Sequence, residues 1–149
     1  RNTIASATCA HAVGEGTQAT ADAAASEGFN TTASGFAGHA EGYETTASAY
    51  ASSAGGYYTV ADQAYQTATG KYNLTGQSGV LFSVGNGTGT DMRSDALQIH
   101  EDGNAVLAGN LEFNGINLQD TLASLHDRIA ALELALESIL SEMTAPSND

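Results

Sequence analysis

The 149 residues include 17 glycines, one proline and no tryptophan, and alanine dominates the 42% hydrophobic share, so a thick core of large side chains is not expected. The net charge of −13, from 4 basic and 17 acidic residues, argues against binding to nucleic acid or to an anionic membrane surface, because both need clustered Lys and Arg. One cysteine rules out an intrachain disulfide, and no apolar run is long enough for direct membrane insertion. We interpret the start at Arg1, without Met or a signal region, as a processed product or a fragment.

Residues 5–74 divide into five consecutive units of fourteen residues without an insertion. Every unit begins with alanine and carries glycine in its tenth column, at Gly14, Gly28, Gly42, Gly56 and Gly70. Small residues at columns one, three and five, and again at eight and ten, alternate with the period of a strand. The repeat therefore predicts stacked coils, each with two short strands and two turns, and the glycine suits a turn of positive φ. A helix is the competing interpretation, but a helical stripe recurs every three or four residues and not every fourteen.

Stacking brings equal columns above one another at roughly 4.8 Å, so each column is expected to form a ladder. Phe29, Tyr43 and Tyr57 are the expected aromatic ladder, with a shorter one at Phe36 and Tyr50. A threonine ladder is expected at Thr17, Thr31, Thr45 and Thr59. The exposed aromatics favour either contact with neighbouring subunits or stacking on sugar rings, which makes the first ladder a candidate ligand site.

The sequence HAEG at residues 39–42, followed by TTAS at residues 45–48, resembles the YadA-like head repeats of trimeric autotransporter adhesins and the HAEG repeats of phage tail and appendage fibres. The resemblance covers about half of the chain. It implies a left-handed parallel β-roll head over residues 1–74, which forms an intertwined homotrimer around a common axis. The last unit departs from the pattern at Tyr65 and Gln66, which we interpret as the closing cap of the stack.

Residues 75–116 contain larger apolar residues in three runs, at residues 80–84, 96–99 and 105–113, which predict three or four short strands. Asp102-Gly103 is typical of a hairpin turn. The order GKYN, VGNGT, RSDA and DGN is similar to the segment that follows HAEG repeats in phage appendage proteins. That resemblance implies a compact β-rich connector leading to a coiled coil, sometimes within a chaperone region that cleaves itself off.

Residues 117–144 carry apolar side chains at alternating spacings of four and three residues, which predicts an uninterrupted coiled-coil seam. The seam consists of Leu118, Leu122, Leu125, Ile129, Leu132, Leu136, Ile139 and Met143. Arg128 and Glu133 have an interchain ion-pair spacing that favours parallel chains, and their hexapeptide matches a pattern of three-stranded coiled coils. The seam alone leaves dimer or trimer open, and the head resemblance favours a trimer. Asp120 or Thr121 is expected to cap the helix, Pro146 to end it, and residues 145–149 to form a disordered tail.

Catalytic and metal-binding patterns are weak in this sequence. His100 lacks an ordered triad motif, and Lys71 with Ser78 is the only Ser-Lys arrangement for self-cleavage, so we expect no enzyme and no cofactor. Threefold symmetry would gather three copies of His11 or His39 near an axis as a metal site. Their column also holds alanine, serine and threonine, which favours a turn position that tolerates many residues. The acids considered for Ca²⁺ are Asp91, Asp95, Glu101 and Asp102, and they lack the alternating loop of an EF-hand.

Cys9 shares its column with alanines and is expected to be a buried small residue. Three glycosylation sequons, at Asn30, Asn73 and Asn86, matter only in a secretory pathway that glycosylates.

Together the patterns predict a structural and adhesive trimeric fibre segment, extracellular on a virion or a bacterial cell surface, with carbohydrate or a host-surface receptor as its partner. The alternative is the C-terminal assembly region of a phage tail or appendage protein.

Overall fold

The computed structural model of the protein describes residues 2–144. The chain divides into two compact units, Arg1–Ala108 and Gly109–Asp149. The first unit is built from strands, and the second contains a short hairpin followed by one long helix. The tail expected at residues 145–149 and the helix stop expected at Pro146 lie outside the described residues. The protein is therefore mainly β with one C-terminal helix, as the sequence predicts.

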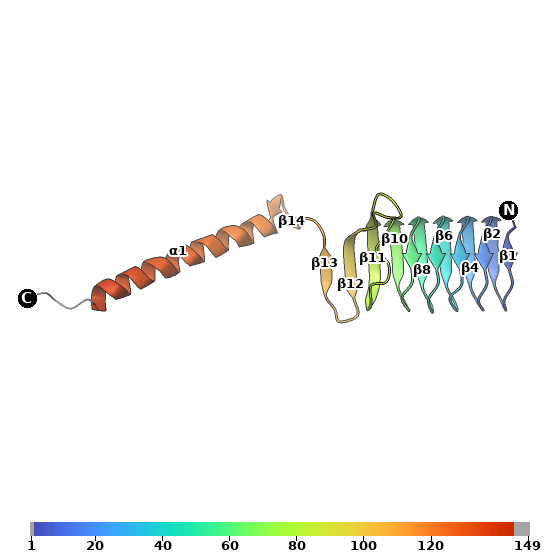
Figure 1. The fold of residues 1–149 in the computed structure, drawn as a ribbon, viewed down its shortest axis with the longest axis horizontal. Helices are drawn as coiled ribbons and strands as arrows, with labels where there is room; N and C mark the ends of the chain where they lie inside the picture. The colour runs from blue at the N-terminus through green and yellow to red at the C-terminus, as the bar shows by residue number, and fades with distance from the viewer. Residues whose placement is uncertain (1, 145–149) are drawn as a thin grey trace, which may run out of the picture. The chain divides into compact units, whose positions relative to one another are not determined.

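The first unit is a β-solenoid of about six turns, and the repeats form two parallel sheets (Figure 1). One sheet contains the five-residue strands β2 (His11–Glu15), β4 (Ala25–Phe29), β6 (His39–Tyr43), β8 (Ser53–Tyr57) and β10 (Thr67–Lys71). The other contains the two-residue strands β1 (Ile4–Ala5), β3 (Gln18–Ala19), β5 (Thr32–Ala33), β7 (Thr46–Ala47) and β9 (Val60–Ala61). Neighbouring strands pair fourteen residues apart, as Gly14 with Gly28. The predicted coil of two strands and two turns is confirmed.

Small side chains form the core of the solenoid. The fully buried residues include Ala19, Ala33, Ala47 and Ala61 in the first column, Ser26, Ala40, Ala54 and Ala68 in the eighth, and Thr17, Thr31, Thr45 and Thr59 in the thirteenth. Buried hydroxyls bond within their own coil, since Thr45 Oγ1 donates to the Glu41 carbonyl and Thr59 Oγ1 to the Gly55 carbonyl, each at 3.1 Å. The coil is so thin that its interior holds mainly small side chains, and of the threonine column only the Thr17 hydroxyl lacks a hydrogen-bond partner among the described residues.

The third and fifth columns lie in a turn, so their assignment to a strand was wrong. The fifth column adopts left-handed backbone, with φ of 57° at Cys9, 56° at Ala23, 52° at Ala37, 48° at Ala51 and 64° at Tyr65. All five residues of this column are exposed, so the side chain at this position points away from the core. Cys9 is therefore exposed, and the expectation that it is buried was wrong.

The glycine of the tenth column has positive φ, as predicted, but it lies inside a five-residue strand and not in a turn. A Cβ on Gly14 would lie 1.9 Å from the carbonyl oxygen of Gly28, and one on Gly42 would lie 2.3 Å from that of Gly56. No side chain fits at such a distance, so the close stacking of backbones requires glycine here.

The sheet of long strands continues beyond the repeats. Strand β11 (Val80–Asn86) pairs in parallel with β10, and β12 (Asp95–His100) and β13 (Ala105–Leu107) add antiparallel strands. The turn at Asp102-Gly103 joins β12 to β13, which confirms the predicted hairpin. The fifth repeat does not close this sheet, so its interpretation as the end of the stack was wrong here.

The sheet of short strands does end at β9, and a side chain closes it. In the preceding coil the Thr46 amide donates to the Thr59 carbonyl at 2.9 Å. At the last coil the Val60 amide donates instead to Asn73 Oδ1, and Asn73 Nδ2 donates back to the Val60 carbonyl, both at 2.8 Å. The Asn73 amide therefore takes the place of a further strand, and the sequence analysis did not foresee this.

Gln66 caps the same end of the solenoid. Its Oε1 accepts hydrogen bonds from the backbone amides of Asp62 at 2.9 Å and Gln63 at 3.1 Å, where earlier coils use a backbone carbonyl. The predicted capping role is thus confirmed for Gln66 in the sheet of short strands. Tyr65, the other residue of that prediction, remains exposed.

The second unit begins with the hairpin of β14 (Glu112–Phe113) and β15 (Ile116–Asn117), followed by α1 (Leu118–Thr144). Asn117 Oδ1 accepts hydrogen bonds from the backbone amides of Gln119 at 2.9 Å and Asp120 at 3.2 Å. The predicted helix is confirmed, but capping by Asp120 or Thr121 was wrong. Asn117 caps the helix because it directly precedes the first helical residue and its side chain reaches the free amides.

Candidate interaction surfaces

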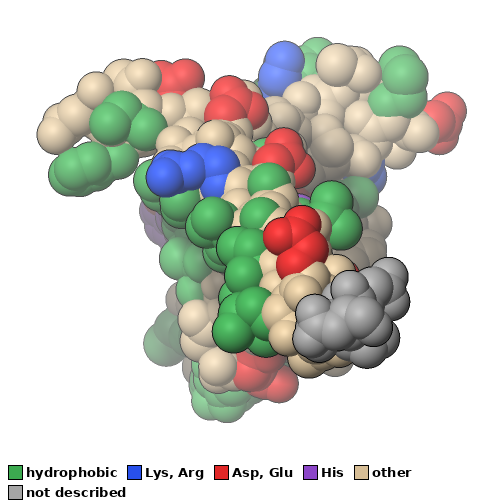
Figure 2. All heavy atoms as spheres, turned by 90° about the vertical axis from the view of Figure 1, so that its left-hand side faces the viewer, with side chains coloured by type: hydrophobic (Ala, Val, Ile, Leu, Met, Phe, Trp, Pro, Cys, Tyr) green, Lys and Arg blue, Asp and Glu red, His purple; other side chains and the backbone are tan. Residues whose placement is uncertain are grey.

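The apolar seam of α1 is uncovered along its whole length. No described residue of the helix is buried, and the seam residues range from 38% exposed at Leu118 to 77% at Met143. The exposed fractions in between are 66% for Leu122, 43% for Leu125, 54% for Ile129, 70% for Leu132, 57% for Leu136 and 54% for Ile139. Figure 2, which faces this end of the chain, shows hydrophobic side chains at the surface among acidic ones and few basic ones. A row of this length has no packing partner in the described chain.

Two further features of α1 bear on association. Arg128 and Glu133 belong to no ion pair within residues 2–144, so both are available to another chain. Leu134 and Leu140 are 70% and 51% exposed and lie outside the predicted seam, which widens the apolar surface of the helix.

The expected aromatic ladder of the roll is present. The rings of Phe29 and Tyr43 stack at 5.0 Å and 12°, and those of Tyr43 and Tyr57 at 5.2 Å and 20°. The shorter ladder of Phe36 and Tyr50 stacks at 5.3 Å and 8°.

This stacking limits what the ladder offers to a ligand. Both faces of Tyr43 are covered by Phe29 and Tyr57, and Tyr57 also meets Tyr58 edge-on at 4.8 Å. A sugar ring stacks on an open aromatic face, and the gap between neighbouring rings admits none. The ladder therefore presents ring edges and hydroxyl groups along its length, which suits packing against another chain better than stacking on sugars.

A second tyrosine pair, missed by the sequence analysis, lies beside this ladder. Tyr58 and Tyr72 stack at 5.0 Å and 17°, and their spacing of fourteen residues is the signal that would have revealed them. A hydrogen bond to the Glu44 carboxylate, together with desolvation and the charge of Glu44, raises the pKa of Tyr58 from 10.0 to about 12. Desolvation and a hydrogen bond with Tyr57 raise the pKa of Tyr72.

Buried polar contacts fasten the connector to the last coil, and these were also missed. Arg93 Nη1 donates to the carbonyls of Tyr58 at 3.0 Å and Asn73 at 3.1 Å. Asp95 is 8% exposed, and its two oxygens accept from the Leu74 amide at 3.0 Å and Gln98 Nε2 at 2.7 Å. The contacts of Arg93 and the contact of Asp95 with Leu74 join residues twenty or more positions apart, which no local sequence pattern reports.

The residues considered for catalysis are not brought together. His100 Nε2 lies 3.2 Å from Gln98 Oε1, an amide and not a serine hydroxyl. No hydrogen bond joins Lys71 to Ser78 in the described part of the chain.

The residues considered for metal binding do not form a cluster, and Asp95 is buried and hydrogen-bonded within the protein. His11 lies 3.7 Å from Glu27, and His39 lies 3.6 Å from Glu41, all with exposed side chains. The Asp102 carboxylate accepts hydrogen bonds from the backbone and side-chain amides of Asn104, and these bonds lower the pKa of Asp102. Among residues 2–144, no three His, Cys, Asp or Glu side chains are placed to hold a metal ion.

The sequons differ in accessibility. Asn73 is fully buried with its side chain engaged, so it offers no glycosylation site, and Asn86 is exposed but accepts a hydrogen bond from Ser94 Oγ at 2.6 Å. Asn30 is half-buried in left-handed backbone with φ of 51°.

No family model, curated protein or solved structure matches this chain. Among residues 2–144, no helix combines the length and the apolar character that crossing a membrane requires.

Proposed function

We propose that the chain is a structural and adhesive segment of a parallel homotrimeric fibre, exposed outside the cell on a virion or a bacterial surface. The exposed seam of α1 is the observation that carries the proposal. In this arrangement α1 forms a three-stranded coiled coil, and the solenoid is a left-handed β-roll head that presents a repetitive surface or acts as a spacer.

The seam supports a coiled coil on physical grounds. A single helix in water gains most of its stability from packing an apolar face, and α1 packs its seam against nothing in its own chain. Leucine and isoleucine at alternating spacings of four and three fit the knobs-into-holes packing of supercoiled helices. Parallel chains place Arg128 of one helix opposite Glu133 of the next, and the hexapeptide around them together with the head resemblance supports three chains.

The solenoid complements this role. Its core is completed within one chain, so the coils stay folded while their outer columns remain available to partners. A coiled coil would hold three such heads at high local concentration and in a common register. The exposed edges of the tyrosine ladder would then either pack between heads or face a host-surface receptor.

The proposal is tested by the solution mass of the whole chain from light scattering. We expect a mass near three chains, and the seam variants Leu125→Asp and Ile129→Asp are expected to be monomeric because a charge replaces a buried apolar side chain. Ala131→Asp, at an outer heptad position, is the matched control and keeps the trimer. A dimer would retain the coiled coil but not the trimer, and a monomeric wild-type chain would overturn the proposal.

A further inference from the structure

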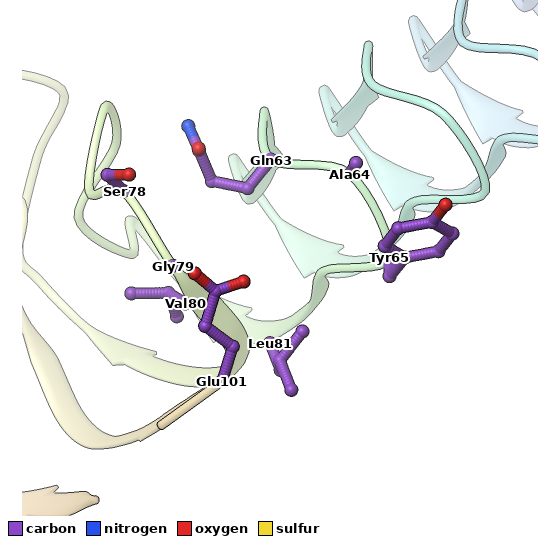
Figure 3. A pocket seen from close by; sticks show the side chains of 8 residues that line it. All are labelled: Gln63, Ala64, Tyr65, Ser78, Gly79, Val80, Leu81 and Glu101. Carbon is purple, nitrogen blue, oxygen red and sulfur yellow. The ribbon is translucent and has the colours of Figure 1, made fainter. Parts of the chain in front are cut away.

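A pocket of about 210 Å³ opens at the end of the solenoid (Figure 3). Three segments that are distant in the sequence line it: residues 63–65 of the last repeat, residues 78–81 at the start of β11, and Glu101 after β12. The Glu101 amide donates to the Gly79 carbonyl at 2.9 Å, which fixes two of these walls to each other.

Three polar side chains of this pocket are not used by the protein itself, whereas Gln63, which also lines it, donates from Nε2 to Asp62 Oδ1 at 3.2 Å. Within residues 2–144, the Glu101 carboxylate, the Ser78 hydroxyl and the Tyr65 hydroxyl take part in no hydrogen bond or ion pair. Neighbouring carboxylates differ, because Asp62 accepts from the Gly76 amide at 2.6 Å and Asp102 from the Asn104 amide at 2.9 Å. The pocket therefore combines free acceptors and donors with apolar walls.

Tyr65 is the residue that departs from the repeat at this place. Its column holds cysteine or alanine in the four preceding units, all exposed and in the same left-handed backbone. Tyr65 keeps that conformation, with φ of 64°, which is unfavourable for a bulky side chain. Its ring meets only the edge contact with Tyr50 at 5.7 Å and remains 65% exposed, the largest exposed fraction of any aromatic residue in the solenoid. Because the turn imposes this backbone on every unit, what distinguishes Tyr65 is the size and the exposure of its ring.

We propose that this pocket binds one pyranose ring of a neutral or amino sugar. Tyr65 and Leu81 offer an aromatic and an aliphatic surface to the C–H face of the ring. Glu101 and Ser78 offer partners to adjacent hydroxyl groups, or to the ammonium of an amino sugar. Acidic sugars are excluded, because a second carboxylate would lie beside Glu101 in a chain of net charge −13.

The pocket size fits a ligand of this class. Sites for drug-sized molecules have volumes of about 300–1,000 Å³, so a pocket of about 210 Å³ admits a single ring. The proposal rests on the adhesive part of the proposed function and not on the oligomeric state, because one chain supplies the whole pocket.

The test measures binding of three probes to the full chain by saturation-transfer NMR: the methyl glycosides of glucose, glucosamine and glucuronic acid. We expect the first two to bind and the third not to bind. Tyr65→Ala is expected to weaken binding about tenfold through loss of the aromatic surface. That variant folds, because alanine occupies the same column in three other units. Glu101→Gln is expected to remove the preference for glucosamine over glucose.

The controls separate the pocket from the ladder. Tyr43→Ala alters the ladder, and Asp91→Asn removes an exposed carboxylate elsewhere, so neither is expected to change the binding. Binding that survives Tyr65→Ala and Glu101→Gln but is lost in Tyr43→Ala overturns the pocket while the adhesive function stands. Absence of binding for all three glycosides overturns the pocket, and the mass measurement then decides the trimeric fibre independently.

Discussion

In the solenoid Ala19, Ala33, Ala47, Ala61 and the threonine column have no exposed surface within one chain, whereas no described residue of α1 is buried. The two regions also differ in side-chain size, because the solenoid buries methyl groups and hydroxyls while the helix exposes leucine and isoleucine. A coil of fourteen residues is completed by the coils beside it in the same chain, and a single helix has no such neighbour. The comparison teaches that the solenoid completes its core within one chain, whereas the apolar seam of α1 has no packing partner among the described residues.

Gly42→Ala is expected to destabilise the solenoid, the region that completes its own core, more than Asn73→Ala or Glu44→Gln. The new Cβ would lie 2.3 Å from the Gly56 carbonyl oxygen at φ of 105°, so overpacking and backbone strain add. We expect the free energy of unfolding of the solenoid to fall by about 4 kcal/mol in urea denaturation. Gly109→Ala is the control, since a Cβ there meets nothing within 4 Å, and it is expected to be nearly neutral. Equal stability of the two variants would refute the stacking argument.

Asn73→Ala is expected to have the next largest effect. The change leaves the Val60 amide and carbonyl without the partner that closes the sheet of short strands. Because both groups are partly buried, the free energy of unfolding is expected to fall by about 2 kcal/mol. Hydrogen exchange at the Val60 amide should also accelerate, while Asn110→Ala, an exposed change in the second unit, should leave both readouts unaltered. An unchanged exchange rate at Val60 would show that the cap is not needed.

Glu44→Gln is expected to have the smallest effect, which appears only at high pH. The pKa of Tyr58 is raised from 10.0 to about 12, so the folded protein keeps this proton where the unfolded chain loses it. The contribution of the protonated Tyr58 hydroxyl to the stability of the fold is therefore complete below about pH 10 and is lost as the pH rises toward about 12. Removing the Glu44 charge should lower the pKa of Tyr58, measured from tyrosinate absorbance, and Glu15→Gln is the control. A titration identical to the wild type would contradict the assigned hydrogen bond.

The sequence was most informative where structure follows a period. The spacing of fourteen revealed the two sheets and the stacked rings of Phe29 and Tyr43, and the four-three spacing revealed α1. It was less informative about which columns of the repeat lie in strands and which lie in turns, because small residues at columns three and five fit a strand or a left-handed turn equally well. Cys9 was placed in the core for that reason, although its column lies in the turn.

The sequence by itself determined the repeat, a glycine of positive φ in every unit, and the apolar seam of the helix, because each is a local period that neighbouring coils or turns repeat. Only the tertiary structure decided how the repeats end. Asn73 closes one sheet while β11 extends the other, and Arg93 fastens the connector to the last coil. These are single contacts between distant segments, and a contact that occurs only once produces no repeating pattern in the sequence.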